Sequence, residues 1–116
     1  MISIGQGKYR IWMKEEKLDD GIVLIISGGK LSHIGSVVLS EPRTSRSGKG
    51  VSCTSQVINI FGHKEEEIAR VFAEKTCLKK KIPVLCVCGI HIDCATKKDI
   101  TVLVSNAKKL LKKYMS

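Results

Sequence analysis

Aromatic residues are scarce in this chain of 116 residues, which contains one tryptophan, two tyrosines and two phenylalanines. They are scattered, so the stacking platform of a single-strand nucleic-acid binder is missing, and nucleic acid is not the expected partner. No apolar run approaches the roughly 20 residues that a membrane span needs. The first ten residues also lack the apolar stretch of a secretory signal. We therefore expect a soluble, cytoplasmic protein with no membrane partner.

Two common site signatures are absent as well. The phosphate-binding pattern G-x-x-x-x-G-K-[ST] does not occur, so nucleotide hydrolysis of that type is not expected. The paired C-x2-C spacing of structural zinc sites is also missing. The five cysteines are odd in number and most lie inside apolar segments, which favours a reducing compartment over a disulfide framework.

The composition is that of a folded, strongly basic domain. Apolar residues make up 43% of the chain, and the net charge is +9. The length supports one domain, spanning residues 1–116, with a real core. A charge of this size favours anionic partners, and an acidic protein or a phosphate-bearing small molecule would both qualify.

Hydrophobic periodicity predicts the order ββββαβα, an α+β fold with a mainly antiparallel sheet and two helices on one face. The predicted strands are 8–18, 21–27, 34–39, 51–61 and 82–88, and the predicted helices are 64–80 and 96 to the end of the chain. Two helices cover only one face of a sheet. Because strands 21–27 and 82–88 are apolar on both sides, we expect the second face to be buried in a homodimer.

Polar side chains follow two of the predicted strands where each leads into a helix. His91 and Asp93 come after strand 82–88, and His63 comes after strand 51–61. A β-α-β crossover makes it the default expectation that these two strands are neighbours in one sheet, which would bring their ends close together. Ligand sites are commonly built in such places, so these ends are the candidate site.

The same region contains cysteines that invite other interpretations. Cys86, Cys88 and Cys94 lie within nine residues of His91 and Asp93, so zinc binding and a Cys-His nucleophile must be considered. The spacing suits neither, and free cysteine is often a small buried hydrophobe. We therefore predict no metal site and no catalytic residue.

The segment 43–50 reads RTSRSGKG and contains three cations and no hydrophobic residue, so it must be a loop. Its glycines and serines expose backbone N–H groups, and its cations could hold an anion. A solvated hairpin loop explains the composition equally well. Both interpretations stay open on the residues alone.

Three segments together resemble one small family, the LpdD-like proteins, which are D subunits associated with non-oxidative hydroxyarylic acid decarboxylases and are described as prenylated flavin chaperones. The resemblance covers residues 20–112. The fold of this family is similar to that of proteasome assembly chaperones. The segments are His33-Ile34-Gly35 with Pro42-Arg43, Gly62-His63-Lys64-Glu65 with Ile68-Ala69-Arg70, and Gly89-Ile90-His91-Ile92-Asp93 with Ala95-Thr96.

The resemblance implies binding of prenylated flavin mononucleotide or FMN, and its delivery to a UbiD-type decarboxylase, rather than catalysis by this chain. The phosphate would pair with Arg43, Lys30 or Lys64. A pocket at the strand ends would contact the ring edge, with Asp93 orienting one imidazole or accepting from the flavin. The candidate cofactor-binding residues are Lys30, His33, Arg43, His63, Lys64, His91 and Asp93.

Two other classes of function remain as alternatives. The first is an assembly chaperone that holds a protein partner through its sheet and binds no cofactor. The second is a small metal-dependent or cysteine-dependent enzyme, which would contain bound zinc or a reactive thiol. A yellow chromophore on the purified protein would separate the flavin chaperone from the first alternative.

Overall fold

The computed structural model describes residues 1–60 and 64–116, and of Lys64 it describes only the backbone. No helix in these ranges is long and apolar enough to cross a membrane. The elements in chain order are β1 (Ile2–Ile4), a 3-10 helix η1 (Gly7–Tyr9), β2 (Ile11–Leu18), β3 (Gly21–Gly29), β4 (Ser36–Thr44), β5 (Val51–Asn59), α1 (Lys64–Lys80), β6 (Val84–His91) and α2 (Lys97–Met115).

The strands form one sheet in the order β1-β2-β3-β6-β4-β5. The central pair, β3 and β6, is parallel, and its register runs from Ile22 opposite Val84 to Gly29 opposite His91. The other pairs of neighbouring strands are antiparallel. This mainly antiparallel α+β arrangement is the predicted fold class.

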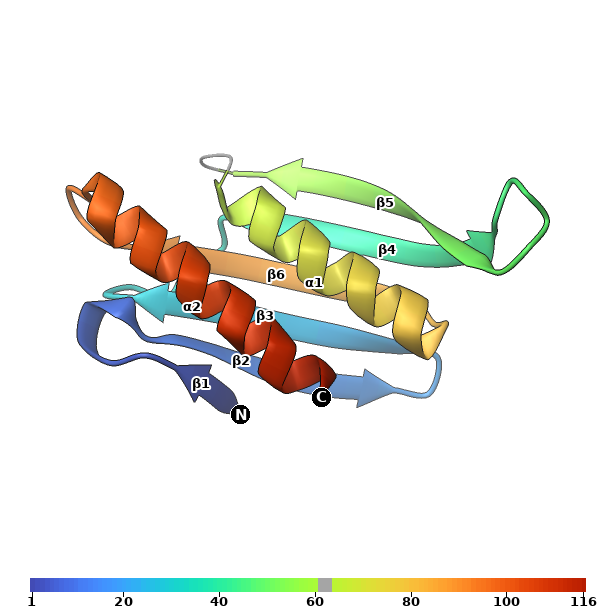
Figure 1. The fold of residues 1–116 in the computed structure, drawn as a ribbon, viewed down its shortest axis with the longest axis horizontal. Helices are drawn as coiled ribbons and strands as arrows, with labels where there is room; N and C mark the ends of the chain where they lie inside the picture. Colours follow the sequence, from blue (N-terminus) through green and yellow to red (C-terminus); the bar gives the residue numbers. More distant parts are fainter. Residues whose placement is uncertain (61–63) are drawn as a thin grey trace.

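Both helices lie on one face of the sheet (Figure 1). The core lies between the sheet and the helices. Its residues on the sheet include Leu24, Cys86 and Val38, which lie side by side on β3, β6 and β4 and are fully buried. Phe72 of α1 and Leu110 of α2 belong to the same core cluster. Along the central strands β3, β6 and β4, about every second side chain enters this core, because the side chains of a strand point to opposite faces in turn.

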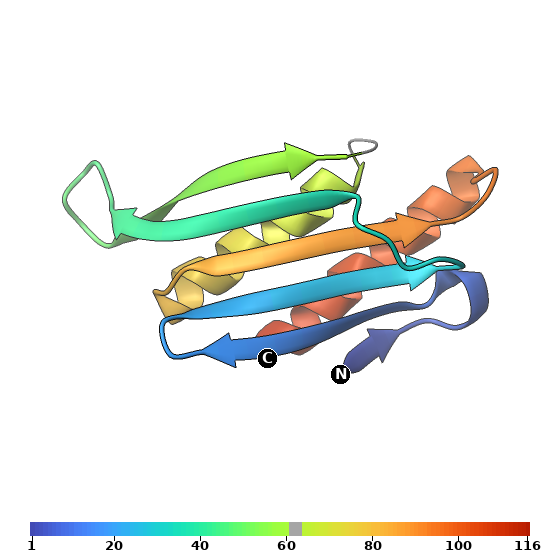
Figure 2. The ribbon, with the colours of Figure 1, turned by 180° about the vertical axis from the view of Figure 1, so that it is seen from behind.

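The remaining side chains of the central strands line the opposite face of the sheet, which no helix of the described residues covers (Figure 2). We call it the open sheet face. At its centre lie seven apolar residues on four adjacent strands, most of them half-buried: Val23, Ile25, Val37, Leu39, Ile58, Leu85 and Val87. An apolar patch of this kind on a single chain is typical of an interaction surface.

The helix α2 begins with the predicted capping box. The backbone N–H of Asp99 donates to Thr96 Oγ1 at 3.1 Å, and the N–H of Thr96 donates to Asp99 Oδ2 at 3.0 Å. Two of the otherwise unpaired backbone donors at the start of the helix are thus satisfied. The same carboxylate accepts from the Tyr9 hydroxyl at 2.6 Å, which ties η1 to α2.

Three details of the strand prediction are wrong. Strand β1 was not predicted, because three residues carry too little periodicity. Strand β4 does not end at residue 39 but continues through Pro42 to Thr44. It can do so because β6 pairs with β4 only as far as Ser40, which leaves one side of β4 without a neighbour there among the described residues. Strands β5 and β6 are not neighbours, because β4 lies between them.

Candidate functional site

The carboxyl ends of the parallel strands β3 and β6 meet at one edge of the sheet. After β3 the chain turns back along the end of β6, where the N–H of Lys30 donates to the carbonyl of His91 at 2.8 Å. The N–H of Gly35 then donates to the carbonyl of Cys88 at 3.0 Å. Residues 30–35 are thereby fixed against the end of β6.

Glu65, in the first turn of α1, connects this segment to β6. Its Oε1 lies 3.3 Å from His33 Nε2 and also accepts from the backbone N–H of Ile90 at 3.3 Å. The carboxylate is largely buried, and its Oε2 has no hydrogen-bond partner among the described residues. One side chain therefore joins helix α1, strand β6 and the segment after β3.

Two glycines make this close packing possible. A β-carbon at Gly35 would lie 2.5 Å from Cδ of Glu65 and would overlap its Oε2. A β-carbon at Gly89 would lie 2.5 Å from the carbonyl carbon of His33 and would overlap its oxygen. Real side chains essentially never show such contacts, so a side chain at Gly89 would collide with backbone, whereas one at Gly35 would displace the carboxyl group of Glu65. Both glycines serve close approach and not a positive φ.

A second imidazole and a second carboxylate complete the group. His91 Nε2 lies 2.7 Å from Asp93 Oδ1, and the rings of His33 and His91 meet edge to face with their centroids 5.8 Å apart. We call His33, Glu65, His91 and Asp93 the strand-end site. It offers ring nitrogens and carboxylate oxygens that can exchange hydrogen bonds with a polar ring edge.

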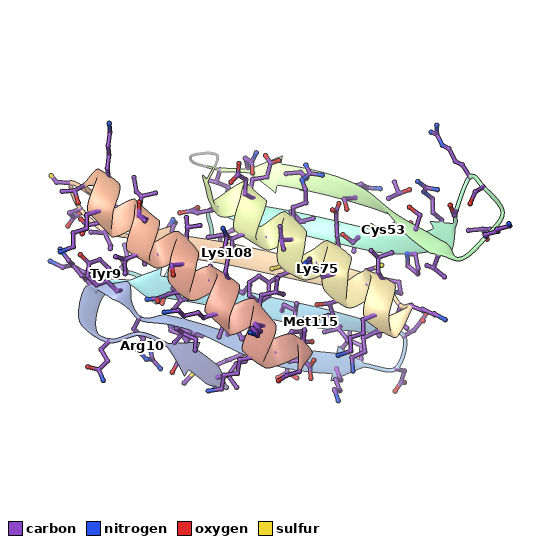
Figure 3. All side chains as sticks on the ribbon, in the orientation of Figure 1. Tyr9, Arg10, Cys53, Lys75, Lys108 and Met115 are labelled. Atoms are coloured by element: carbon purple, nitrogen blue, oxygen red, sulfur yellow. The ribbon has the colours of Figure 1, made fainter. Side chains whose placement is uncertain are left out.

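A small polar pocket lies beside the strand-end site, since residues of the segment after β3 also line it. Its volume is about 190 Å³, and it contains two cations, Arg10 and Lys30, and the ring of Trp12. We call it the Arg10 pocket. Figure 3 shows Tyr9 and Arg10 near the end of the sheet where α2 begins. Two cations close together are suited to a phosphate.

The residues before Arg10 are held in place by α2. The side-chain amide of Asn106 donates to the carbonyl of Tyr9 at 2.8 Å, and Lys8 Nζ lies 3.3 Å from Asp99. Hydrogen bonds from the Thr96 N–H and the Tyr9 hydroxyl hold the pKa of Asp99 well below its usual range. The ionised carboxylate thus keeps one wall of the Arg10 pocket anchored to the helix layer.

The structure separates the predicted site residues into three groups. Lys30, His33, His91 and Asp93 come together at one edge of the sheet. His63 and the side chain of Lys64 lie outside the described residues. The expected convergence of Arg43 with the histidines is wrong. Because β4 runs antiparallel to β6, Arg43 lies at the opposite end of the sheet, where it pairs with Ser52 and donates to Thr54.

The cysteines do not join the strand-end site as a metal or thiolate centre. Cys86 and Cys88 point into the core, and burial raises the pKa of both thiols. Cys94 is exposed, beyond β6. Within residues 1–60 and 64–116 there is no cluster of three or more potential ligands that could hold a metal ion.

Three residues of the strand-end site and the Arg10 pocket were not predicted. Glu65 was not among the candidate cofactor-binding residues, although it lies in the segment Gly62–Glu65 that carries the family resemblance. Arg10 and Trp12 lie at the start of β2, where sequence periodicity says nothing about contact with the distant turn after β3. Only the pairing of β2 with β3 brings them to the site.

The chain resembles known proteins in both sequence family and fold. A family model described as "Prenylated flavin chaperone LpdD-like domain" matches residues 5–116. A solved structure titled as a novel chaperone complex for yeast 20S proteasome assembly is similar in fold, with a TM-score of 0.64 over 98% of this chain and 90% of that chain at 16% identity. No curated protein matches the sequence.

These matches confirm the expected resemblance in both family and fold. The family description also confirms the prediction that the chain is a chaperone-like domain and not an enzyme. The three segments that suggested the family supply His33 and Gly35, Glu65, and Gly89 to Asp93, and these residues meet at the strand-end site. The chain belongs to the family of prenylated flavin chaperone LpdD-like domains.

Proposed function

We propose that this chain binds prenylated FMN, or FMN itself, at the strand-end site and passes it to a UbiD-type decarboxylase. The observation that carries the proposal is the meeting of His33, Glu65 and His91 at the carboxyl ends of the parallel strands β3 and β6. Ligands of open α/β sheets commonly bind outside the carboxyl ends of such strands. The family description supplies the cofactor class.

The residues present fit a flavin mononucleotide in two parts. The Arg10 pocket, with Arg10 and Lys30, suits the phosphate dianion. Its volume of about 190 Å³ is below the range of roughly 300–1,000 Å³ typical of whole-ligand sites, so the ring must extend beyond it. His33 and His91 lie beside the pocket and would exchange hydrogen bonds with the polar ring edge, while the buried carboxylate of Glu65 holds His33 in position.

The apolar side of the prenylated ring needs a wall that one chain offers only in part. The neighbours of Trp12 on β2 are buried in the core, so its ring lies on the side of the open sheet face. Trp12 also lines the Arg10 pocket. Ile25 and Val87, which pair across β3 and β6, lie on the same open sheet face. A second copy packed on the open sheet face would complete the wall, and we therefore propose a homodimer as the binding unit.

Titration with FMN, followed by flavin fluorescence, tests the site. A lost charge-assisted hydrogen bond to phosphate is worth about 1.5–3 kcal/mol, so Arg10→Ala should weaken binding by roughly tenfold to a hundredfold. Arg43→Ala is the matched control, because it removes the same charge at the other end of the sheet. Equal losses in both variants would show that only the overall positive charge matters.

A second candidate function is a protein-assembly chaperone without a cofactor. The fold shared with a yeast proteasome assembly chaperone and the apolar open sheet face favour it. It predicts that neither FMN nor its prenylated form binds in the micromolar range. Under this alternative, substitutions at the strand-end site would alter stability alone.

A further inference from the structure

A second recess lies on the other side of the molecule, between the two helices. We call it the helix groove. It has a volume of about 380 Å³ and takes side chains from both helices. Its principal lining residues are Ile68, Val71, Phe72, Ile100, Val104 and Leu111. None of them belongs to the strand-end site, so the groove needs a separate explanation.

The groove is open along its length and apolar at its floor. Phe72 and Leu111 at the floor are 2% and 9% exposed, whereas Val71 at the rim is 40% exposed. The lining on α2 extends from Ile100 to Leu111, which at about 1.5 Å per residue is roughly 16 Å. That length matches three turns of a second helix laid along it.

The surface around the groove carries an excess of positive charge. Lys108 lines the groove, against a single carboxylate, Glu67. Helix α2 has six lysines, and its one acidic residue, Asp99, is buried in the capping box. Figure 3, which looks onto the helix layer, shows Lys108 on α2 and Lys75 on α1. An occupant that complements both features has an apolar stripe flanked by acidic residues.

We propose that the helix groove binds an acidic amphipathic helix of a partner protein. The apolar stripe of such a helix would cover Val71 and Val104, and its carboxylates would face Lys108 and Lys75, as in other helix-in-groove complexes. A second copy of this chain is disfavoured there, because two basic helix layers would be brought face to face. A membrane surface is disfavoured because the apolar floor is recessed between the helices and does not protrude.

This proposal stands apart from cofactor binding and is tested on the full chain with a defined probe. The probe is a fluorescein-labelled peptide of roughly 15 residues, with leucines repeating at i, i+3, i+4 and i+7 and glutamates on the flanks. Fluorescence anisotropy measures its binding. We expect micromolar affinity, a loss of roughly fivefold to tenfold in Lys108→Glu, and a similar or greater loss in Val71→Glu. Affinity should also fall as salt rises.

Lys113→Glu is the matched control, because Lys113 is an exposed lysine of α2 that does not line the groove. It should weaken binding much less than Lys108→Glu. A scrambled peptide of the same composition, and a version with lysine in place of glutamate, should bind far more weakly.

Several results would overturn the proposal. Equal binding of the scrambled peptide would reduce the groove to a general basic surface. Sedimentation of the chain with anionic phospholipid vesicles, abolished by Val71→Glu, would assign the groove to a membrane. A change of oligomeric state in Val71→Glu alone would assign it to a second copy of the chain.

Discussion

Replacing Gly35 by alanine should break the strand-end site through one identifiable clash. The three atoms nearest to the added β-carbon all belong to the carboxyl group of Glu65. The Glu65 side chain must therefore leave, and it loses its contacts with the Ile90 N–H and with His33. A hydrogen bond to a charged group is worth about 1.5–3 kcal/mol, so we expect a comparable loss in the free energy of unfolding.

The clash can be separated from any general effect of the substitution by a double-mutant cycle. In Glu65→Ala the clashing atoms are gone, so adding Gly35→Ala should change the free energy of unfolding by less than about 0.5 kcal/mol. Gly89→Ala is the contrasting control, because its β-carbon meets the backbone carbonyl of His33 and no side-chain truncation relieves it.

Urea denaturation followed by circular dichroism measures all four members of the cycle. The single variant Gly35→Ala should also lower Tm by about 6–12 °C, taking about 4 °C per kcal/mol for a chain of this length. If Gly35→Ala costs the same with and without Glu65, the carboxylate does not occupy the space above Gly35. The proposed architecture of the strand-end site would then be wrong.

Three further predictions concern the core, the helix cap and the open sheet face. Leu24→Ala should cost about 2–5 kcal/mol in urea denaturation because Leu24 is fully buried, whereas Leu18→Ala, at an exposed position, should cost about 0.5 kcal/mol or less. The Thr96 N–H lowers the pKa of Asp99, so the stabilisation that the ionised Asp99 gives the fold is complete above the unfolded pKa of about 3.9 and is lost as the pH falls further. The difference in unfolding free energy between the native chain and Asp99→Asn should therefore become smaller below about pH 4. A difference that stays constant down to pH 2 would contradict this. Sedimentation should give twice the monomer mass of 12.8 kDa at micromolar concentration, and Val87→Glu on the open sheet face should give the monomer; a monomeric native chain would rule the proposed homodimer out.

The parts of the fold that were predictable from sequence are those encoded within one segment. Strands β3 and β6 have uninterrupted apolar runs, and the cap of α2 has both of its partners three residues apart. Strand order is not encoded locally. Nothing in the sequence of β6 says that it lies between β3 and β4, so a chain that places β5 beside β6 has the same periodicity.

The candidate site was predictable to the same extent. The histidine-bearing end of β6 could be recognised because it directly follows an apolar strand and precedes a helix cap. Arg43 was misplaced because composition identifies a basic loop but not the end of the sheet at which the loop lies. Arg10 and Trp12 reach the site only through the antiparallel pairing of β2 with β3, a long-range contact.

Native mass spectrometry of the chain after incubation with prenylated FMN tests the central claim most directly, with FMN and riboflavin as parallel samples. Riboflavin lacks the phosphate that the Arg10 pocket is proposed to hold. We predict retention of prenylated FMN by the native chain, weaker retention of riboflavin, and a large loss in Arg10→Ala but not in Arg43→Ala. A chain that keeps only its own mass in all three samples would contradict the cofactor chaperone and leave the assembly chaperone as the better account.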